Sequence, residues 1–461
     1  MNSESSSSTS ARKKHIMVVM YPEWSSFNAS FMLARQLMNR GCRVVYYVIC
    51  APGFKEYIID SGFEYQELSR EFEQERMKYY LDQLNEKYRK MPGSIRMYRL
   101  KRRMKYRVQE DLWAKMEEVL REEPPHLVLL DPMMLYFSIP FLKLKIPIIN
   151  LNFTLISFPS SRVPPVFSGI IPGKKNGWLS HVLNTAAWAK ILMVLVRLEF
   201  FDSLALRFAR GFTSNSIQSM RKVIKKYGGG RLRRTEYFSK LKVPELITCP
   251  REFDFPHAPG RDSTCYIGAS VDIYRKEEPL YWGGIDKQKP IVYCTLGSYS
   301  KKWKYRKKLY HAVIKVMEQR PGWQLILQMP DDEDIEEFSP FPANVFVEKW
   351  VPHLEVLPHT SVVICHAGLG TVREAVYFGV PMIVFPIERD QPGYAARVVY
   401  HGLGLPGNIK KITPGIMSEL LDRVSTDDHI RRSCQRMQQV FREQEKCLKG
   451  VEFIENFLAD K

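Results

Sequence analysis

Several features that define common protein classes are missing from this 461-residue sequence. No apolar run reaches the roughly 20 residues that a membrane-spanning helix needs. The eight cysteines are scattered and form no Cys-x-x-Cys pair, which argues against a disulfide or zinc framework. No Gly-x-Gly-x-x-Gly motif follows the first apolar run of either half, so a dinucleotide-binding dehydrogenase is disfavoured. These absences fit a protein of a reducing compartment, and we expect a cytoplasmic location.

Acidic residues are absent from one long basic stretch. The sequence "KYRKMPGSIRMYRLKRRMKYR", Lys87 to Arg107, has ten basic side chains and no acidic one, in a chain of net charge +18. Such patches attract the phosphates of nucleic acids, anionic lipids or soluble substrates, although a solvated helix face has the same composition. No zinc-finger spacing, RNP-like strand or basic-zipper heptad accompanies the charge, so no nucleic-acid partner is expected. Interleaved Tyr and Met residues predict peripheral contact with an anionic membrane at its inner face.

Short apolar runs alternate with segments of helical spacing along most of the chain, a pattern typical of parallel α/β sheets. Residues 1–13 are polar and Ser-rich, without the apolar stretch of a secretory signal, and we expect a disordered tail there. The alternation pauses at 271–288, a polar stretch with Pro and Gly that predicts a linker between two domains. The expected strands lie within 15–21, 42–49, 126–131, 146–153, 290–298, 323–329, 344–350, 361–368 and 381–386.

Ligands of parallel sheets bind beyond the carboxyl ends of the strands, so the residues that follow each apolar run are candidates for a site. Glycines let the backbone approach an anion, and a helix that starts near Gly370 offers free amides and a positive dipole end. A phosphate is the expected ligand, although each feature alone also fits a structural histidine or a tight turn. The candidates are Gly297, Ser298, Trp350, His366, Gly368, Gly370, Thr371, Asp390 and Gln391.

The order of these residues carries a resemblance to a known family. The segment "KWVPHLEVLPHTSVVICHAGLGTVREAVYFGVPMIVFPIERDQPGYAARVVYHGLG", Lys349 to Gly404, closely resembles the signature of the UDP-glycosyltransferase superfamily. The matching residues are Trp350, Pro352, His359, His366, Gly368, Thr371, Glu374, Gly379, Val380, Pro381, Pro386, Asp390, Gln391 and Ala395. A fainter likeness extends to residues 249–268 and to the first strand and helix. The resemblance implies the α/β GT-B fold, two facing Rossmann-like domains with parallel sheets, as in soluble bacterial and plant-like members.

The resemblance also implies a division of tasks between the domains. The N-terminal domain would bind the acceptor, the C-terminal domain would bind the nucleotide-sugar donor, and the last helix would cross back to the N-terminal domain. With the tail and the linker included, the expected boundaries are 1–13, 14–270, 271–288, 289–430 and 431–461.

The resemblance implies roles for the matched residues. Trp350 would stack on the uracil ring, and the backbone of Val351 or His353 would read its edge. Glu374 would accept hydrogen bonds from the ribose hydroxyls, a task that suits a carboxylate. The diphosphate would be bound by Ser298, His366, Gly370 and Thr371, with Gly368 also in the donor site, and the sugar by Asp390 and Gln391. Donors aimed at the charge that grows on the diphosphate would lower the barrier.

The chain departs from the superfamily pattern in two places. Near the donor, His353, Gly370 and Tyr394 replace a frequent Gln, Asn and Asn, which puts donor affinity and base preference in question. After the first strand, Ser25 and Ser26 occupy the Gly and His positions of the usual Gly-His-x-x-Pro turn. The usual catalytic histidine is therefore missing.

A carboxylate is the expected substitute for this histidine, because an inverting transfer needs a base for the proton of the acceptor hydroxyl. Asp131 ends the apolar run 126–131 and matches the acid that supports the superfamily histidine, so we favour it. Glu23, in the same loop as Ser26, is the competing candidate. For either residue, a loop carboxylate exposed to water is the alternative.

The sequence thus predicts an inverting, metal-independent hexosyltransferase that moves a sugar, preferably glucose, from UDP to a hydroxyl of a lipophilic small molecule or lipid. Segments 131–141 and 178–205 are expected to form the lipophilic pocket. No cofactor and no metal are expected, because the acidic run 331–337 resembles a polar loop and helix N-termini can neutralise a diphosphate. A degenerate nucleotide-sugar-binding protein and a UDP-sugar epimerase are the alternatives. The acceptor, the sugar and the oligomeric state stay open.

Overall fold

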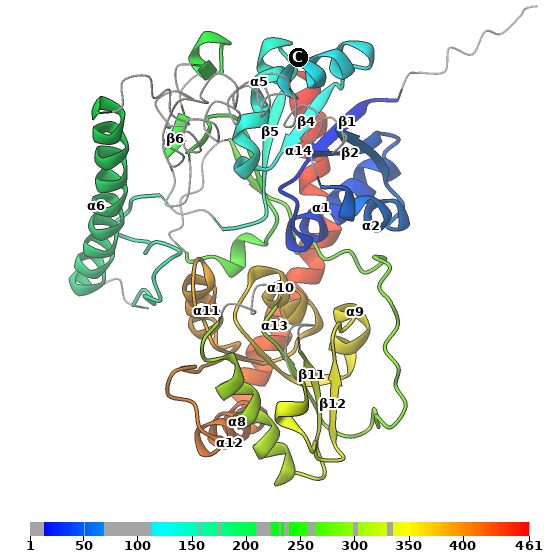
Figure 1. Cartoon of the computed structure of the whole chain (residues 1–461), viewed down its shortest axis with the longest axis vertical. Helices are drawn as coiled ribbons and strands as arrows, with labels where there is room; N and C mark the ends of the chain where they lie inside the picture. The colour runs from blue at the N-terminus through cyan, green and yellow to red at the C-terminus, as the bar shows by residue number, and fades with distance from the viewer. Residues whose placement is uncertain are drawn as a thin grey trace, which may run out of the picture.

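The computed structural model describes residues 13–49, 51–68, 112–155, 158–173, 177–208, 223–229, 232–234, 239–256, 263–297, 303–329 and 335–460. Each half of the chain contains a parallel sheet, and the two halves face one another as the upper and lower lobes of Figure 1. The basic stretch 87–107, Ser298 and most of the acidic run 331–337 lie outside the described residues.

The first sheet has seven strands in the order β3-β2-β1-β4-β5-β8-β9, all paired in parallel. Its strands are β1 (His15–Val19), β2 (Arg43–Ile49), β3 (Glu64–Leu68), β4 (Leu127–Leu130), β5 (Ile148–Asn152), β8 (Glu245–Ile247) and β9 (Thr264–Tyr266). Along β1, Ile16 and Val18 belong to one buried cluster, whereas Met17 and Val19 belong to another. Both faces of the sheet are therefore covered, which explains why its strands are continuous apolar runs.

The second sheet has six parallel strands in the order β12-β11-β10-β13-β14-β15. Its strands are β10 (Ile291–Thr295), β11 (Gln324–Gln328), β12 (Val345–Glu348), β13 (Thr360–Cys365), β14 (Met382–Val384) and β15 (Gly404–Pro406). Each apolar run expected to be a strand contains one, and the two-sheet α/β fold is confirmed. In both sheets the strand order reverses beside the first strand, between β1 and β4 and between β10 and β13. Such a reversal opens a crevice at the carboxyl ends of the strands.

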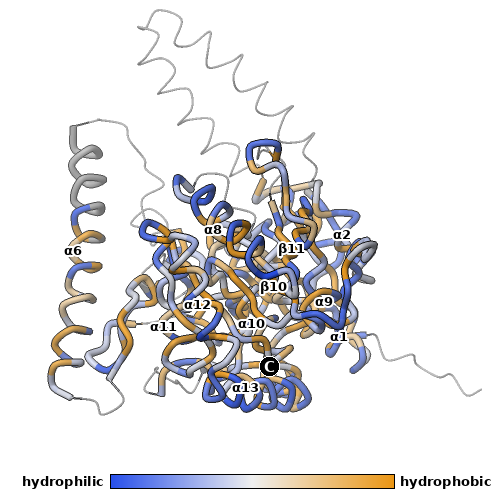
Figure 2. The backbone as a smooth tube through the Cα atoms, turned by 90° about the horizontal axis from the view of Figure 1, so that it is seen from below, coloured by the Kyte–Doolittle hydropathy of each residue, from blue (hydrophilic) through white to orange (hydrophobic). Residues whose placement is uncertain are grey.

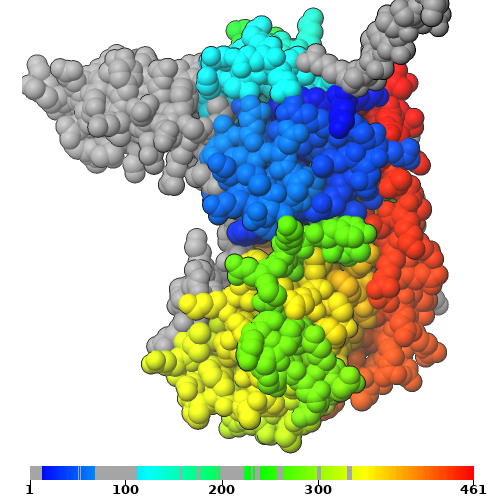
Figure 3. All heavy atoms as spheres, turned by 90° about the vertical axis from the view of Figure 1, so that its right-hand side faces the viewer, coloured from blue at the N-terminus to red at the C-terminus, as the bar shows by residue number. Residues whose placement is uncertain are grey.

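The last two helices connect the two halves. Helix α13 (Asp428–Lys446) packs against α10 (Leu369–Phe378), whereas α14 (Lys449–Ala459) packs against α1 (Trp24–Asn39) and β9. Val451 and Ile454 of α14 belong to the buried cluster beneath β1. Figures 1 and 3 show this C-terminal segment, in red, running along one side of both lobes.

The other helices cover the sheets, with one exception. They are α2 (Lys55–Asp60), α5 (Ser138–Lys143), α8 (Arg306–Glu318), α9 (His353–Val356), α11 (Gln391–Tyr400) and α12 (Pro414–Thr426), and a short hairpin joins β6 (Leu232–Arg234) to β7 (Ser239–Leu241). The exception is α6 (Trp178–Phe208), which stands apart from the body of the molecule in Figures 1 and 2. Within the described part of the chain, no helix is both long and apolar enough to cross a membrane.

Candidate functional site

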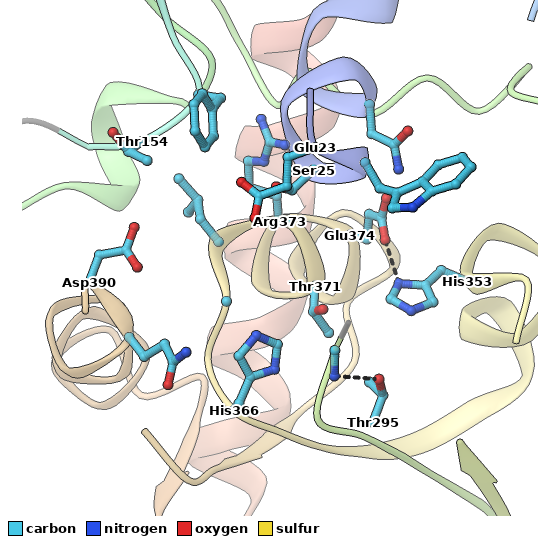
Figure 4. Close-up of a pocket in the computed structure, with 18 of the residues that line it drawn as sticks. Glu23, Ser25, Thr154, Thr295, His353, His366, Thr371, Arg373, Glu374 and Asp390 are labelled. Atoms are coloured by element: carbon cyan, nitrogen blue, oxygen red, sulfur yellow. Dashed lines mark hydrogen bonds and ion pairs between the residues drawn. The ribbon is translucent and has the colours of Figure 1, made fainter. Parts of the chain in front are cut away.

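A cavity of about 430 Å³ lies between the two lobes and is lined by residues of both. Tyr21 and Glu23 follow β1, Gly297 follows β10, and His366 and Gly368 follow β13. These are the strands beside which each sheet reverses its order, so the crevices of the two sheets open toward one another. Figure 4 shows polar side chains from both lobes directed into this space.

The imidazole of His366 is held between two glycines at the floor of the cavity. A Cβ atom on Gly297 would lie 2.6 Å from Cε1 of His366, and one on Gly368 would lie 2.4 Å from Nε2, so any larger residue would displace the ring. Gly297 also has φ +71, a conformation that L side chains rarely adopt. Burial and the nearby His353 lower the pKa of His366 to about 4, so the ring is neutral at physiological pH. A neutral imidazole keeps one N–H to donate.

The start of α10 adds backbone donors beside this histidine. Gly368 is the N-cap of the helix, in extended conformation and without a side-chain cap, so the first amides of α10 are available to a ligand. Gly370 and Thr371 in this first turn line the cavity. In the described structure, the Nδ1 atom of His366 is buried without a hydrogen-bond partner. Together the helix dipole, the free amides and a neutral histidine form a place for an anion.

Glu374 lies one turn further along α10 and is held from two sides. Its Oε1 accepts a hydrogen bond from Nη1 of Arg275 at 3.0 Å, and its Oε2 lies 2.7 Å from Nδ1 of His353. Desolvation acts to raise the pKa of Glu374, but the charge of Arg275 and the hydrogen bond with His353 bring it down to about 2. Glu374 therefore stays a carboxylate throughout the physiological range and keeps lone pairs for further donors.

Two aromatic side chains, one from each lobe, meet at one end of the cavity. Trp350 follows β12 and is 47% exposed, although it is large and apolar. Trp24, the first residue of α1, lies with its ring centroid 5.8 Å from that of Trp350, at an interplanar angle of 53°. Tyr57 packs edge-on against Trp24 at 4.5 Å and supports it from behind. The exposed face of Trp350 can receive a flat ring.

The start of α11 contributes hydrogen-bonding groups at the opposite end of the cavity. Oε1 of Gln391 accepts from the backbone N–H groups of Ile387 and Glu388, at 2.9 and 3.0 Å. This fixes the side chain and leaves its NH2 group to donate. Asp390 lines the cavity too, and its Oδ2 accepts from the hydroxyl of Tyr394 at 2.9 Å. Tyr394 thus has a structural role at the position where the pattern often has Asn.

The first turn of α1 presents a different set of residues from the expected one. Glu23, the N-cap residue of α1, and Ser25 line the cavity. Ser26 does not line it, because the next position on the helix turns toward the core, where its side chain is fully buried. The expectation that Ser26 takes the place of the missing histidine is therefore corrected, since Ser25 is the serine that reaches the cavity.

Asp131 lies behind the cavity wall and does not line it. Its side chain is fully buried, Oδ1 accepts from the backbone N–H of Met133 at 2.8 Å, and Oδ2 accepts from that of Tyr21 at 3.1 Å. Burial raises the pKa of Asp131 to about 7, and the charge of Glu23 acts in the same direction. Tyr21 and Met133 both line the cavity, so Asp131 positions two wall residues. This placement reverses the expected preference for Asp131 over Glu23.

Known proteins resemble this chain in sequence and in fold. Residues 323–446 match the family described as the erythromycin biosynthesis protein CIII-like C-terminal domain. The NDP-glycosyltransferase YjiC of Bacillus subtilis (strain 168) is 29% identical over 225 residues, which cover 48% of this chain and 56% of the relative. Demethyllactenocin mycarosyltransferase of Streptomyces fradiae is 28% identical over 219 residues, 47% of this chain and 46% of the relative. The chain thus spans about half the length of the curated relatives that it matches.

The fold comparison covers nearly the whole molecule. A solved structure of the glycotransferase of kitacinnamycin has a TM-score of 0.66 and 19% identity over 97% of this chain and all of that one. CalG4, the calicheamicin glycosyltransferase, has a TM-score of 0.63 and 18% identity over 97% of this chain. These neighbours and the two facing parallel sheets confirm the GT-B fold.

These findings support the resemblance of this chain to the UDP-glycosyltransferase superfamily. Most of the site residues predicted from the sequence meet at the cavity, whereas Val351 is buried behind it and does not line it. Ser298 lies outside the described residues. The predicted site residues that line the cavity are Glu23, Gly297, Trp350, His353, His366, Gly368, Gly370, Thr371, Glu374, Asp390 and Gln391.

Some cavity residues were not anticipated from the superfamily pattern. Arg275, the cation that holds Glu374, lies in the stretch expected to be a plain linker, and no sequence signal marks it. Trp24 follows Glu23 directly, so its place in the loop after β1 could have indicated it. None of the described side chains of α6 lines the cavity, which corrects the expectation that this part of segment 178–205 forms a lipophilic pocket. Among the described residues, no group of three or more His, Cys, Asp or Glu could hold a metal ion.

Proposed function

We propose that the protein is an inverting glycosyltransferase that moves a hexosyl group, preferably glucose, from a UDP-sugar to a hydroxyl of a lipophilic acceptor. One observation carries this proposal: an anion site, a fixed carboxylate and an exposed aromatic face line the same cavity, which residues of both lobes enclose. The curated relatives, which are named as transferases of sugars, support the reaction class.

The C-terminal wall fits a nucleotide diphosphate sugar in one orientation. The base would stack on Trp350, and the ribose hydroxyls would donate to Glu374, which remains ionised. The diphosphate would then reach the first amides of α10 and the neutral ring of His366. Beyond it, Asp390 and Gln391 would bind the hydroxyls of the sugar. In Figure 4, Glu374, His366 and Asp390 lie in this order across the cavity, which supports the orientation.

The reaction would be a single displacement at the anomeric carbon. The acceptor oxygen attacks the face opposite the diphosphate, its proton passes to a carboxylate, and the bond between the anomeric carbon and the phosphate oxygen breaks as UDP leaves. The α10 amides and His366 would stabilise the charge that develops on the leaving group. We assign the proton acceptor to Glu23, which faces the cavity, and a positioning role to Asp131, which holds Tyr21 and Met133.

A lipophilic acceptor fits the N-terminal wall. Trp24, Met133, Phe153 and Phe167 line this side of the cavity, and none of them carries a charge. Such a surface favours an apolar molecule that presents one hydroxyl toward Glu23. We further propose that the reaction needs neither metal nor cofactor and that the protein works in the cytoplasm, with peripheral contact to the inner face of an anionic membrane through residues 87–107.

A binding protein for nucleotide sugars is the second candidate, because the usual catalytic histidine is absent and Asp131 is sealed behind the wall. A UDP-sugar epimerase would use the same donor wall without an acceptor.

A panel of UDP-sugars, incubated with a lipid extract of the host and read by mass spectrometry, separates these candidates. A glycosylated lipid formed together with free UDP is the expected result. Hydrolysis alone, a changed sugar on intact UDP, or binding without turnover would each contradict the transferase.

A further inference from the structure

Helix α6 carries an unusual share of the apolar surface of the molecule. Seventeen large hydrophobic residues of the described structure are exposed, and eight of them lie on this one helix. They are Trp178, Leu179, Val182, Leu183, Leu192, Met193, Val194 and Val196, which are between 39% and 77% exposed. A concentration of exposed apolar side chains on one element marks an interaction site on a folded protein.

The described side-chain hydrogen bonds between the helix and residues 161–163 of the body lie on one side of the helix. Nδ2 of Asn184 donates to the backbone oxygen of Ser161 at 3.1 Å, and Nε1 of Trp188 donates to that of Val163 at 2.8 Å. Asn184 and Trp188 are four residues apart and share one face of the helix, and both are buried. The exposed apolar residues fall on the remaining faces, where Figure 2 shows hydrophobic colour on a helix separated from the main body.

The described charges on the exposed side of α6 have one sign. Among the exposed side chains described on α6, the charged ones are Lys190 and Arg197, and both are cationic. They are seven residues apart, close to two helical turns, so they lie along one line of the helix surface. Long cationic side chains beside apolar ones can keep their charge in the headgroup layer while their stems lie on acyl chains.

We propose that α6 docks the protein on the surface of a bilayer that contains anionic lipids. The helix would lie flat in the interface, because it is not apolar enough to cross a membrane. The exposed Trp178 at its start suits the boundary between acyl chains and headgroups, and Lys190 and Arg197 suit anionic headgroups. A second copy of the same face would bring like charges together, which disfavours self-association. This proposal does not depend on the proposed enzymatic function.

Co-sedimentation of the full chain with vesicles tests the proposal. The vesicles are phosphatidylcholine alone and an equal mixture of phosphatidylcholine and phosphatidylglycerol. The test variant is Val182→Glu with Met193→Glu, at positions 51% and 55% exposed on α6. The matched control is Ile59→Glu with Ile416→Glu, at positions 47% and 42% exposed on α2 and α12. Both variants replace two exposed apolar residues and change the charge equally. Thermal unfolding verifies that both are folded.

We expect the wild type to bind the mixed vesicles more strongly than the neutral ones. The α6 variant should lose ~10- to 100-fold in partitioning, because two apolar side chains no longer enter the interface. The control variant should stay within about two-fold of the wild type. An absence of vesicle binding, an equal loss in both variants, or a loss confined to a Lys101→Gln, Arg102→Gln, Arg103→Gln variant would overturn the assignment. So would light scattering that shows a dimer in the wild type and a monomer in the α6 variant, without lipid binding.

Discussion

The two walls of the cavity are built in different ways. In the C-terminal wall, most of the lining residues, from Trp350 to Gln391, come from one continuous stretch that crosses β13, α10 and the start of α11, and the others lie near Arg275, Gly297 and Gln328. The N-terminal wall combines four separate pieces, which contain Glu23, Met133, Phe153 and Phe167. A contiguous wall preserves the spacing of its ligand groups in the sequence itself. A composite wall depends on how distant segments pack.

This difference bears on specificity. The C-terminal wall consists of backbone amides, a neutral histidine, an ionised carboxylate and an exposed indole, which together suit one class of ligand. The N-terminal wall includes the apolar side chains of Trp24, Met133, Phe153 and Phe167, which belong to segments outside the strands, and such segments vary easily without harm to the sheet beneath. We therefore expect substitutions in the C-terminal wall to act on donor binding and departure, and those in the N-terminal wall to act on acceptor and proton transfer.

The largest effect is expected at the first turn of α1. Glu23→Gln keeps the size of the side chain but removes the proton acceptor, so turnover should fall ~10²- to 10⁴-fold, while the affinity for UDP stays unchanged. Asp131→Asn should cost much less, since it acts through Tyr21 and Met133. The measurement is single-turnover kinetics with the true acceptor, combined with UDP titration. A fully active Glu23→Gln variant together with an inactive Asp131→Asn variant would show that Asp131 is the proton acceptor. The pKa of Asp131, near 7, should then appear as an inflection in the pH profile of the wild-type rate.

The next effect concerns the departure of UDP. His366→Ala removes a donor to the diphosphate, and we expect turnover to fall ~10²- to 10³-fold with a smaller loss of UDP affinity. His311→Ala, at an exposed position on α8 outside the cavity, is the matched control and should behave like the wild type. Initial rates at saturating donor provide the comparison. Equal rates for both variants would show that His366 does not assist the departure of UDP.

Stacking of the base on Trp350 should contribute less. Trp350→Ala should weaken UDP binding by ~1–3 kcal/mol, measured by calorimetry, because one face of the base loses its partner. Trp178→Ala is the control, since Trp178 is 77% exposed on α6 and lies away from the cavity. If the two variants bind UDP equally well, the base does not stack on Trp350.

A smaller effect should appear in the pH dependence of Arg275→Gln. The pKa of Glu374 is about 2, below its ordinary 4.5. The contribution of the ionised carboxylate to UDP binding is therefore complete above pH 4.5 and is lost as the pH falls toward 2. UDP affinity of the wild type should therefore not depend on Glu374 between about pH 5 and 8. Removing Arg275 raises the pKa of Glu374, so affinity should decline toward pH 5 in the variant. Parallel pH profiles for the two proteins would show that Arg275 does not control this carboxylate.

Metal removal should have the smallest effect. If helix dipoles and His366 neutralise the diphosphate, incubation with EDTA should leave the initial rate unchanged. Loss of activity that magnesium restores would contradict a metal-independent reaction.

The comparison of the walls also explains how much of the molecule could be predicted from sequence. The sheets were predictable because parallel strands buried on both faces are continuous apolar runs, and the groups around His366 were predictable because their spacing is local. Arg275 was not predictable, because its partner Glu374 is distant in sequence and the segment around Arg275 has no periodic pattern of apolar residues. Ser26 and Asp131 were misjudged for a related reason: a one-residue step on a helix, or one hydrogen bond at a strand end, decides whether a side chain faces the cavity.

Hydrogen–deuterium exchange with and without UDP tests the central claim most directly. The first amides of α10, at Leu369, Gly370 and Thr371, have no partner within the helix and should exchange quickly in the free protein. We expect UDP alone to protect these amides and the segment after Trp350, and to leave the first turn of α1 unchanged. Protection confined to α1, or no protection at α10, would contradict the assignment of the C-terminal wall as the donor site.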